Sequence, residues 1–279
     1  MYTFLISFGI FIVTGIVLPL LIVGSVNWTV LPAFAVGVAI FIWMSRRISK
    51  RFEAVNSAAE KELQSLQQLG QQMAQRPPNM RSPGQLGTRI DGVVEIYKSG
   101  FQLSRWQLGV STMLNARIGM LLFSKPQIVP DTSYGECIPY LEKAAVKGKA
   151  AQLLSSLWPA WAMLGIAYYK KDKNDLARVR PVFEKALSNV KKEGMFWQIY
   201  AWLLAKEDQI DEAIAVLARA HEALPEDKAI SENLTALQNR KKMQMKAYGD
   251  LWYQFGLDMP KIQMMPRMQH PRARISRKR

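Results

Sequence analysis

Few side chains in this sequence have the types and spacing that enzyme chemistry requires. The chain contains two histidines, His221 and His270, and one cysteine, Cys137. Neither histidine has a second ligand or an acid–base partner at the spacing of a known metal or catalytic motif. The sequence also lacks a glycine-rich phosphate loop, a Gly-x-Ser-x-Gly turn and a paired-cysteine motif. It therefore predicts a protein that is not an enzyme and that has no cofactor and no metal site.

The single cysteine limits the covalent and metal chemistry further. With Cys137 alone, the chain can form neither an intramolecular disulfide nor a cysteine-based zinc site. A lone thiol also fits a reducing compartment. Because no motif places a histidine or a carboxylate beside it, we interpret Cys137 as a small buried residue and not as a nucleophile.

The other chemistry that the residue types indicate is electrostatic. The formal net charge is +15, and the end of the chain combines many cations with no acidic residue after Pro260. The cations of this segment are Lys261, Arg267, Arg272, Arg274, Arg277, Lys278 and Arg279. Prolines and the lack of a periodic apolar face predict that residues 251–279 form a disordered basic tail. Such a tail binds anionic lipid or nucleic-acid phosphates, or it only increases solubility.

A two-helix pattern organises the second half of the chain. Residues 194–225 place small side chains where two helices would cross, bulky ones beside them, and a proline at the end of the second helix. The positions concerned are Trp197, Tyr200, Ala201, Leu204, Ala213, Leu217, Ala220 and Pro225. These eight positions resemble the tetratricopeptide repeat (TPR), a helix-turn-helix unit of about 34 residues.

The same pattern occurs in the residues before this hairpin. Trp161, Leu164, Gly165 and Tyr168 match the W-x2-L-G-x2-Y signature of the family, and Ile118-Gly119 begins a looser copy with a longer internal loop. The resemblance implies a TPR α-solenoid of about three repeats that is closed by a capping helix. The expected units are repeats at about 112–149, 158–190 and 194–227 and a cap at 228–246, within a helical domain at 88–250.

In the TPR family, the first helices of successive repeats line a concave groove that receives a peptide or a helix. The resemblance places these residues of the chain in the groove: Ala162, Ile166, Tyr169, Gln198, Ile199, Trp202, Lys206, Glu232 and Asn233. Chaperone-binding members clamp a terminal carboxylate with Lys, Arg and Asn, whereas this chain has Ala162, Ile166, Gln198 and Trp202 there. The resemblance thus implies a protein partner that offers an apolar or helical segment. Alternatively, several of these side chains pack between repeats.

The N-terminal 45 residues contain two apolar runs. Residues 2–26 are uncharged and long enough for a hydrocarbon core of roughly 30 Å, and residues 30–44 form a shorter run. We therefore predict a transmembrane hairpin at residues 1–45. A single long anchor and a cleaved signal peptide are the alternatives, although residues 1–9 lack the basic start of a signal peptide.

Basic residues crowd one end of this hairpin. Arg46, Arg47, Lys50 and Arg51 follow the second run, and the turn between the runs has no basic residue. By the positive-inside rule, both termini and the TPR domain are cytoplasmic, which predicts a two-span protein of the cell inner membrane. Glycines in both runs, such as Gly15 and Gly37, either let the two helices approach closely or are simply tolerated in lipid.

Residues 46–75 predict an amphipathic helix that follows the membrane segment. Its apolar residues recur every three or four positions. They are Ile48, Phe52, Val55, Ala59, Leu63, Leu66, Leu69 and Met73. The stripe fits a coiled-coil stalk that makes the protein a homo-oligomer, or a helix that lies on the membrane or packs against the chain's own domain. Three prolines then predict a linker at residues 76–87.

These patterns together predict an all-α protein with a transmembrane hairpin, a stalk helix and a short solenoid. The function that we expect is a membrane-anchored scaffold or adaptor that recruits a protein partner through its cytoplasmic groove. The alternative is a membrane-bound nucleic-acid or ribosome adaptor that acts through the basic tail.

Overall fold

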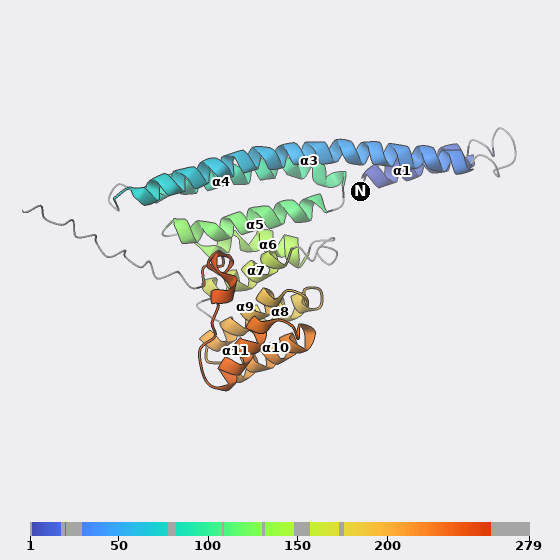
Figure 1. The fold of residues 1–279 in the computed structure, drawn as a ribbon. Helices are drawn as coiled ribbons and strands as arrows, with labels where there is room; N and C mark the ends of the chain where they lie inside the picture. Colours follow the sequence, from blue (N-terminus) through green and yellow to red (C-terminus); the bar gives the residue numbers. More distant parts are fainter. Residues whose placement is uncertain are drawn as a thin grey trace, which may run out of the picture.

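The protein is built from helices. The computed structural model describes residues 2–17, 20, 30–77, 82–107, 109–129, 132–147, 157–172 and 176–257. Within these ranges every regular element is a helix and no strand occurs, so the predicted all-α class is confirmed. A long helical hairpin forms one edge of the molecule, and shorter helices stack beneath it as an array (Figure 1).

The longest helix joins the apolar N-terminal region to the expected stalk without a break. Helix α3 (Val30–Gln75) has 46 residues, and at 1.5 Å per residue it is about 70 Å long. Helix α1 (Tyr2–Ile12) and the π-helical turn η1 (Val13–Val17) pack against the first half of α3. The second run of the expected hairpin and the expected stalk therefore belong to one continuous helix, α3, and are not two separate units.

The α1 and α3 helices approach each other at glycines. A Cβ atom on Gly37 would lie 3.3 Å from the backbone oxygen of Ser7, and a Cβ atom on Gly15 would lie 3.0 Å from the Cβ of Ala33. Larger side chains at either position would force the helices apart. Close approach is thus the role that the structure gives to Gly15 and Gly37.

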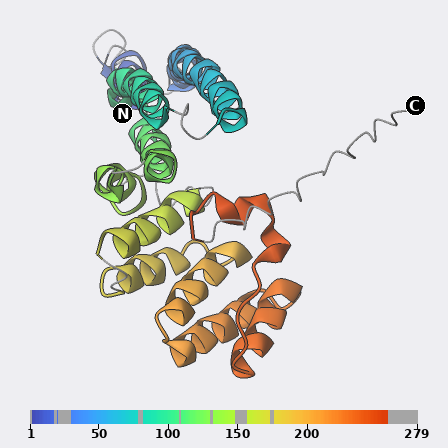
Figure 2. The ribbon, with the colours of Figure 1, turned by 90° about the vertical axis from the view of Figure 1, so that its left-hand side faces the viewer.

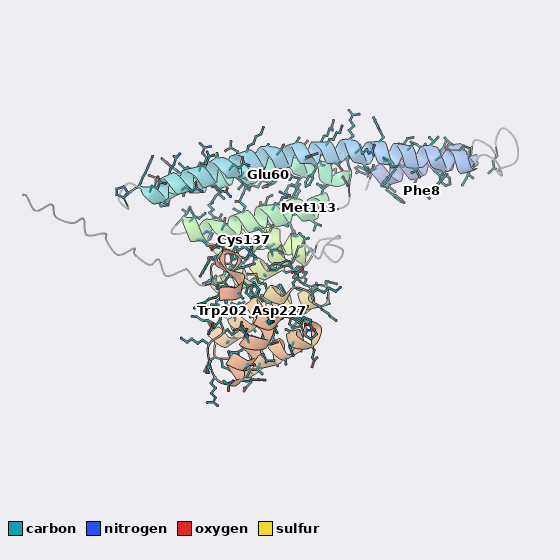
Figure 3. All side chains as sticks on the ribbon, viewed as in Figure 1. Phe8, Glu60, Met113, Cys137, Trp202 and Asp227 are labelled. Atoms are coloured by element: carbon teal, nitrogen blue, oxygen red, sulfur yellow. The ribbon has the colours of Figure 1, made fainter. Side chains whose placement is uncertain are left out.

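The outward side of this hairpin is apolar. Phe4 and Trp43 each have 61% of their surface exposed, and Phe8 lies on the part of the hairpin that projects past the array (Figure 3). The expected spans were residues 2–26 and 30–44, and residues 18, 19 and 21–29 are outside the described part of the chain. No helix among the described residues has both the length and the apolar character needed to cross a membrane.

The second half of α3 pairs with α4 (Pro83–Ser99). Ala59 and Met73 on the expected stripe are buried, and Phe52 and Val55 pack against the main hydrophobic core. The stripe therefore packs against the chain's own domain, which was one of the alternatives for residues 46–75. In this arrangement its apolar face is already covered.

Helix α4 begins inside the segment that was expected to be a linker. Pro83 stands in the first helical turn, where a proline is tolerated because the N–H it lacks would have no partner within the helix. The helix ends at Ser99 and continues into the 3-10 helix η3 (Gly100–Arg105). The chain reverses at Gly109, whose φ of 91° lies in the left-handed region that favours glycine.

The first helix pair of the array is α5 (Val110–Ile128) with α6 (Ile138–Ala145), joined through the 3-10 turn η4 (Tyr134–Glu136). The two helices cross at Gly119, where an added Cβ would lie 2.7 Å from Cγ of Leu141. Only glycine leaves room for the leucine there. Gly119 is thus a small residue at a helix crossing, in line with the pattern of small residues that the sequence shows for such crossings.

Two further pairs and a final helix complete the array (Figure 1). They are α7 (Trp158–Lys171) with α8 (Val179–Leu187), α9 (Gly194–Lys206) with α10 (Ile210–Ala223), and α11 (Lys228–Gln238), which packs on α10. Helix α11 starts at Asp227, whose carboxylate accepts hydrogen bonds from the backbone N–H groups of Ala229 and Ile230. Such an N-cap contributes about 1 kcal/mol to a helix.

Phe183 connects the second pair to the third. On one side, its ring occupies the space that a Cβ on Gly165 would need. On the other side, it stacks on Tyr200 of α9, with ring centroids 4.8 Å apart and an interplanar angle of 5°. The same side chain thus closes the α7–α8 hairpin and joins it to its neighbour, so successive pairs share one continuous core.

Residues 243–257, which we call the strap, follow the array. The strap contains the 3-10 turn η6 (Lys246–Tyr248) and the short helix α12 (Asp250–Tyr253). Residues 251–257 were expected to belong to a disordered tail, but the structure orders them and buries Trp252, Phe255 and Leu257. The prediction of disorder was wrong for these residues because their apolar side chains pack against helices that lie far away in the sequence.

Candidate functional site

The strap lies across the helices that were expected to line the groove. It runs, in red in Figure 2, from the last helices of the array back toward α7. Its residues contact four helices in turn: Gln244 meets α11, Tyr248 and Trp252 meet α9, Phe255 meets α7, and Gln254 meets α5. We call the surface that receives it the inner face, defined by Gln127, Trp158, Gln198, Trp202 and Asn233.

The side chain of Asn233 on α11 binds the main chain at the start of the strap. Its Oδ1 accepts a hydrogen bond of 2.7 Å from the N–H of Gln244, and its Nδ2 donates a bond of 3.0 Å to the carbonyl oxygen of the same residue. Asn233 is buried, and a buried amide must have such partners to offset its desolvation. Because both bonds go to the main chain, this contact recognises a polypeptide and not a particular side chain.

Gln198 of α9 forms the next contact. Its Oε1 accepts a hydrogen bond from Nδ2 of Asn233, and its Nε2 donates one of 2.9 Å to the hydroxyl of Tyr248. Burial raises the pKa of Tyr248 to about 12, so this hydroxyl stays neutral at physiological pH. Gln198 is itself fully buried. The two amides and the phenol therefore form one polar network between the array and the strap.

Two aromatic pairs hold the rest of the strap. Trp252 meets Trp202 of α9 edge to face, with ring centroids 5.6 Å apart, and Phe255 meets Trp158 of α7 at 5.9 Å. Trp252 and Phe255 are both buried. Burial of an aromatic side chain of this size is worth roughly 1.5–3 kcal/mol, and aromatic pairs in these geometries add about 0.5–1.5 kcal/mol. These two residues are the main apolar anchors of the strap.

Eight of the nine expected groove residues fall into three groups in the structure. Ala162, Ile166 and Ile199 are fully buried within the hydrophobic core of the array, as in the alternative in which such side chains pack between repeats. Gln198, Trp202 and Asn233 hold the strap through hydrogen bonds and a ring contact. The exposed members are Lys206 and Glu232, and Lys206 lies over the ring of Trp202 at 5.6 Å.

Tyr169 is the remaining expected groove residue, and its hydroxyl binds Glu207 at the end of α9. It is buried and donates a hydrogen bond of 2.5 Å to Glu207. Burial raises its pKa above the usual tyrosine range, with the bond to Glu207 as the next cause. Tyr169 thus fastens α7 to the end of α9, which is a structural role.

Sequence reasoning missed Trp158, Tyr248, Trp252 and Phe255. The signal that could have identified the last two is their spacing in the cluster Leu-Trp-Tyr-Gln-Phe-Gly-Leu (residues 251–257). Residues three apart lie on the same face of a helical turn. Two aromatics on one face of a short turn are unusual in a disordered basic tail, whose composition is typically poor in aromatics.

The other residues with possible chemistry are placed as follows. Cys137 is buried, its thiol donates to the backbone oxygen of Tyr134 at 3.0 Å, and burial raises its pKa to about 12. His221 pairs with the hydroxyl of Ser231 at 3.2 Å. His270 and the seven tail cations lie outside the described residues. Within the described ranges, no group of three or more His, Cys, Asp or Glu side chains could hold a metal ion.

Comparisons with known proteins assign neither a family nor a function to this chain. No protein-family model matches the chain, and comparisons with curated proteins and with solved structures also give no match.

Proposed function

We propose that this protein is a membrane-anchored scaffold whose helical array holds a segment of a protein partner on its inner face. One observation carries the proposal: the inner face already binds a polypeptide, the chain's own strap. It does so with a backbone-directed asparagine and two aromatic contacts. A surface that recognises main chain and apolar side chains is suited to protein segments and not to small molecules.

The packing of the helix pairs supports a TPR-type array. Gly119 faces Leu141 and Gly165 faces Phe183, so each of the first two hairpins crosses at a glycine. In the third hairpin the corresponding small residue is Ala201, which is fully buried. Under this proposal the array is a short solenoid, and its inner side is the partner-binding groove of the scaffold.

The exposed apolar surface of the α1–α3 hairpin supports membrane attachment. Phe4, Phe34 and Trp43 are among the large apolar side chains that point outward there, and contiguous apolar surface of this kind marks an interaction site. We propose that residues 2–26 and 30–44 are embedded in the bilayer as the expected two spans. The basic residues Arg46–Arg51 then lie at the cytoplasmic interface, and the array is cytoplasmic.

Site-specific photocrosslinking in cells tests the scaffold proposal. A photoreactive amino acid at Lys206 or Glu232, which are exposed beside the inner face, should crosslink one and the same protein. At Glu222, an exposed position on α10 away from the strap contacts, it should not. Adducts from none of these positions, or equal adducts from all three, would contradict the proposal.

A further inference from the structure

The inner face and the strap together show what kind of partner the face accepts. We infer that the inner face is a binding surface for a short peptide with two aromatic side chains three residues apart on one helical turn. We also infer that the strap is an internal copy of this ligand, which a partner must displace. This inference depends on the scaffold function proposed above and names the chemistry and regulation of its groove.

The attachment of the strap is the first argument that it can be displaced. Within the described residues, every backbone–backbone hydrogen bond of residues 243–257 joins the strap to itself, as in Trp252 N–H to Gly249 O at 3.2 Å. Its bonds to the array all involve a side chain of the array: Asn233, Gln198 and Gln127. No backbone ladder has to be broken for the strap to leave.

The polar residues of the inner face are the second argument. Gln198 and Asn233 are buried, and their hydrogen-bond partners are each other and the strap. These partners can be exchanged, since a hydrogen bond to water or to the backbone of another peptide replaces a hydrogen bond to the strap at little net cost in free energy. When the strap is absent, water satisfies both amides, and any incoming peptide backbone can replace Gln244.

The shape of the strap is the third argument. Its helix α12 has only four residues and is flanked by Gly249 and Gly256, which have φ angles of 50° and 61°. Leu251, on the solvent side of α12, is 60% exposed. The buried apolar side chains of the strap are Met245, Trp252, Phe255 and Leu257. The two aromatic rings are the largest of them, so a peptide that offers the same two rings replaces a large part of its contacts.

Helix pairs of the array also contact each other without the strap. The stacking of Phe183 on Tyr200, for example, lies between α8 and α9 and involves no strap residue. Met245, Trp252, Phe255 and Leu257 of the strap extend the same hydrophobic core over the inner face. We therefore expect release of the strap to expose the inner face while the helix pairs stay assembled.

A direct binding experiment tests this inference. The probe is a fluorescein-labelled peptide of residues 243–257, added to the full-length protein in detergent and followed by fluorescence anisotropy. In the intact chain the strap competes at the millimolar effective concentration typical of a short tether. We therefore expect the peptide to bind at least tenfold more tightly to a chain whose strap is released.

Two different variants release the strap, so that one folding failure does not decide the result. Gly249→Val strains the backbone at a position where an added Cβ meets no atom within 4 Å, and it changes no array contact. Trp252→Ala with Phe255→Ala removes both anchors. If neither variant binds the peptide more tightly than the intact chain does, while circular dichroism shows native helicity, the inference is wrong.

Three controls define the specificity. A peptide in which both aromatics are alanine should not bind the released chains. Asn233→Leu added to Gly249→Val should abolish the gain in affinity. A bismaleimide link between Gln127→Cys and Gln254→Cys, in a Cys137→Ala background, should keep the strap in place and block the peptide; binding to the linked chain at the affinity of the released chain would overturn displacement.

The outcomes separate this inference from the scaffold proposal. If the released chain binds the peptide but the photocrosslinks at Lys206 and Glu232 show no partner, the surface is correct and the scaffold function is wrong. If the same partner crosslinks equally to the intact chain and to the Gly249→Val chain, the scaffold function is correct and displacement is wrong.

Discussion

The indole ring of Trp252 meets the indole ring of Trp202 edge to face across 5.6 Å, although the two residues are 50 positions apart in the sequence. Trp202 also lies under the ammonium group of Lys206. The ring is therefore contacted both by the strap and by its own helix, and it is the central anchor point of the inner face.

Removal of this contact should release the strap selectively. We expect Trp252→Ala to raise the hydrogen-exchange rates of residues 243–257 by at least tenfold and to leave those of α9 unchanged, because the contacts that join α9 to α8, such as Phe183 with Tyr200, remain. The measurement is hydrogen exchange followed by mass spectrometry. Tyr253→Ala, on the exposed side of α12, is the matched control and should leave exchange at the wild-type rate. Equal effects of the two variants would contradict the anchor role of Trp252.

Asn233 should be needed for docking, whereas its neighbour Glu232 should not. Asn233→Leu leaves the backbone N–H and C=O of Gln244 and the Oε1 of Gln198 without these hydrogen bonds, at a cost of roughly 1–3 kcal/mol for each buried unsatisfied group. We expect limited proteolysis to cut this variant within residues 243–257 at a protease concentration that spares the wild type. Glu232→Gln, at an exposed position, should keep the wild-type resistance. A resistant Asn233→Leu chain would show that the polar network does not hold the strap.

The crossing of α7 and α8 should tolerate no side chain at Gly165. A Cβ there would overlap the ring of Phe183, and such overpacking typically costs 1–3 kcal/mol. We therefore expect Gly165→Ala to lower the urea midpoint of unfolding. In contrast, Gly92→Ala on α4 meets no atom within 4 Å and should stabilise the helix by about 0.5–1 kcal/mol. A stabilising Gly165→Ala would mean that the two helices are not packed this closely.

The ion pair between α8 and α10 should contribute to stability only above acidic pH. Arg219 binds both carboxylate oxygens of Glu184 at 3.0 and 2.9 Å, and these hydrogen bonds lower the pKa of Glu184. A carboxylate with a lowered pKa in the folded state contributes stability above its unfolded pKa of about 4.3 and loses it as the pH falls.

We therefore expect the melting temperature of the wild type to be slightly higher than that of Glu184→Gln at pH 7. Near pH 3 the two melting temperatures should be equal. The effect should be at most about 1 kcal/mol, because both partners are nearly half exposed. Glu222→Gln, on the same helix α10 as Arg219, is the charge-matched control and should show no such convergence. A melting difference that is unchanged between pH 7 and pH 3 would contradict the assignment.

The N-terminal hairpin should depend on Gly37 but not on Gly9. A larger residue at Gly37 would collide with Ser7 and Phe11, whereas a Cβ on Gly9 meets no atom within 4 Å. The readout is a bismaleimide crosslink between Phe11→Cys and Phe34→Cys in a Cys137→Ala background, since the two wild-type rings lie 5.9 Å apart across the helix pair. We expect Gly37→Leu to reduce the yield of this crosslink in membranes severalfold, and Gly9→Leu to leave it unchanged. Equal crosslink yields in both backgrounds would contradict the helix pairing.

The local features of this protein could be read from the sequence because they arise within short stretches of chain. Helical periodicity, the glycines at helix crossings and the small-against-large pairs such as Gly119 with Leu141 depend on neighbours within a single hairpin. The same local signals predicted the α7–α8 and α9–α10 pairs. They failed at boundaries, for example at Pro83, where a proline-rich segment starts a helix, and at residues 251–257, which were expected to be disordered.

The tertiary structure decided which partner covers each apolar face. An amphipathic stripe shows that a face must be covered, but not by what, because the covering residues come from distant parts of the chain. Ala59 is buried by helices of its own chain and not by a second copy, and Gln127 meets Gln254 across 127 positions. For the same reason the sequence could place Gln198, Trp202 and Asn233 on one face, but only the fold put residues 243–257 against them.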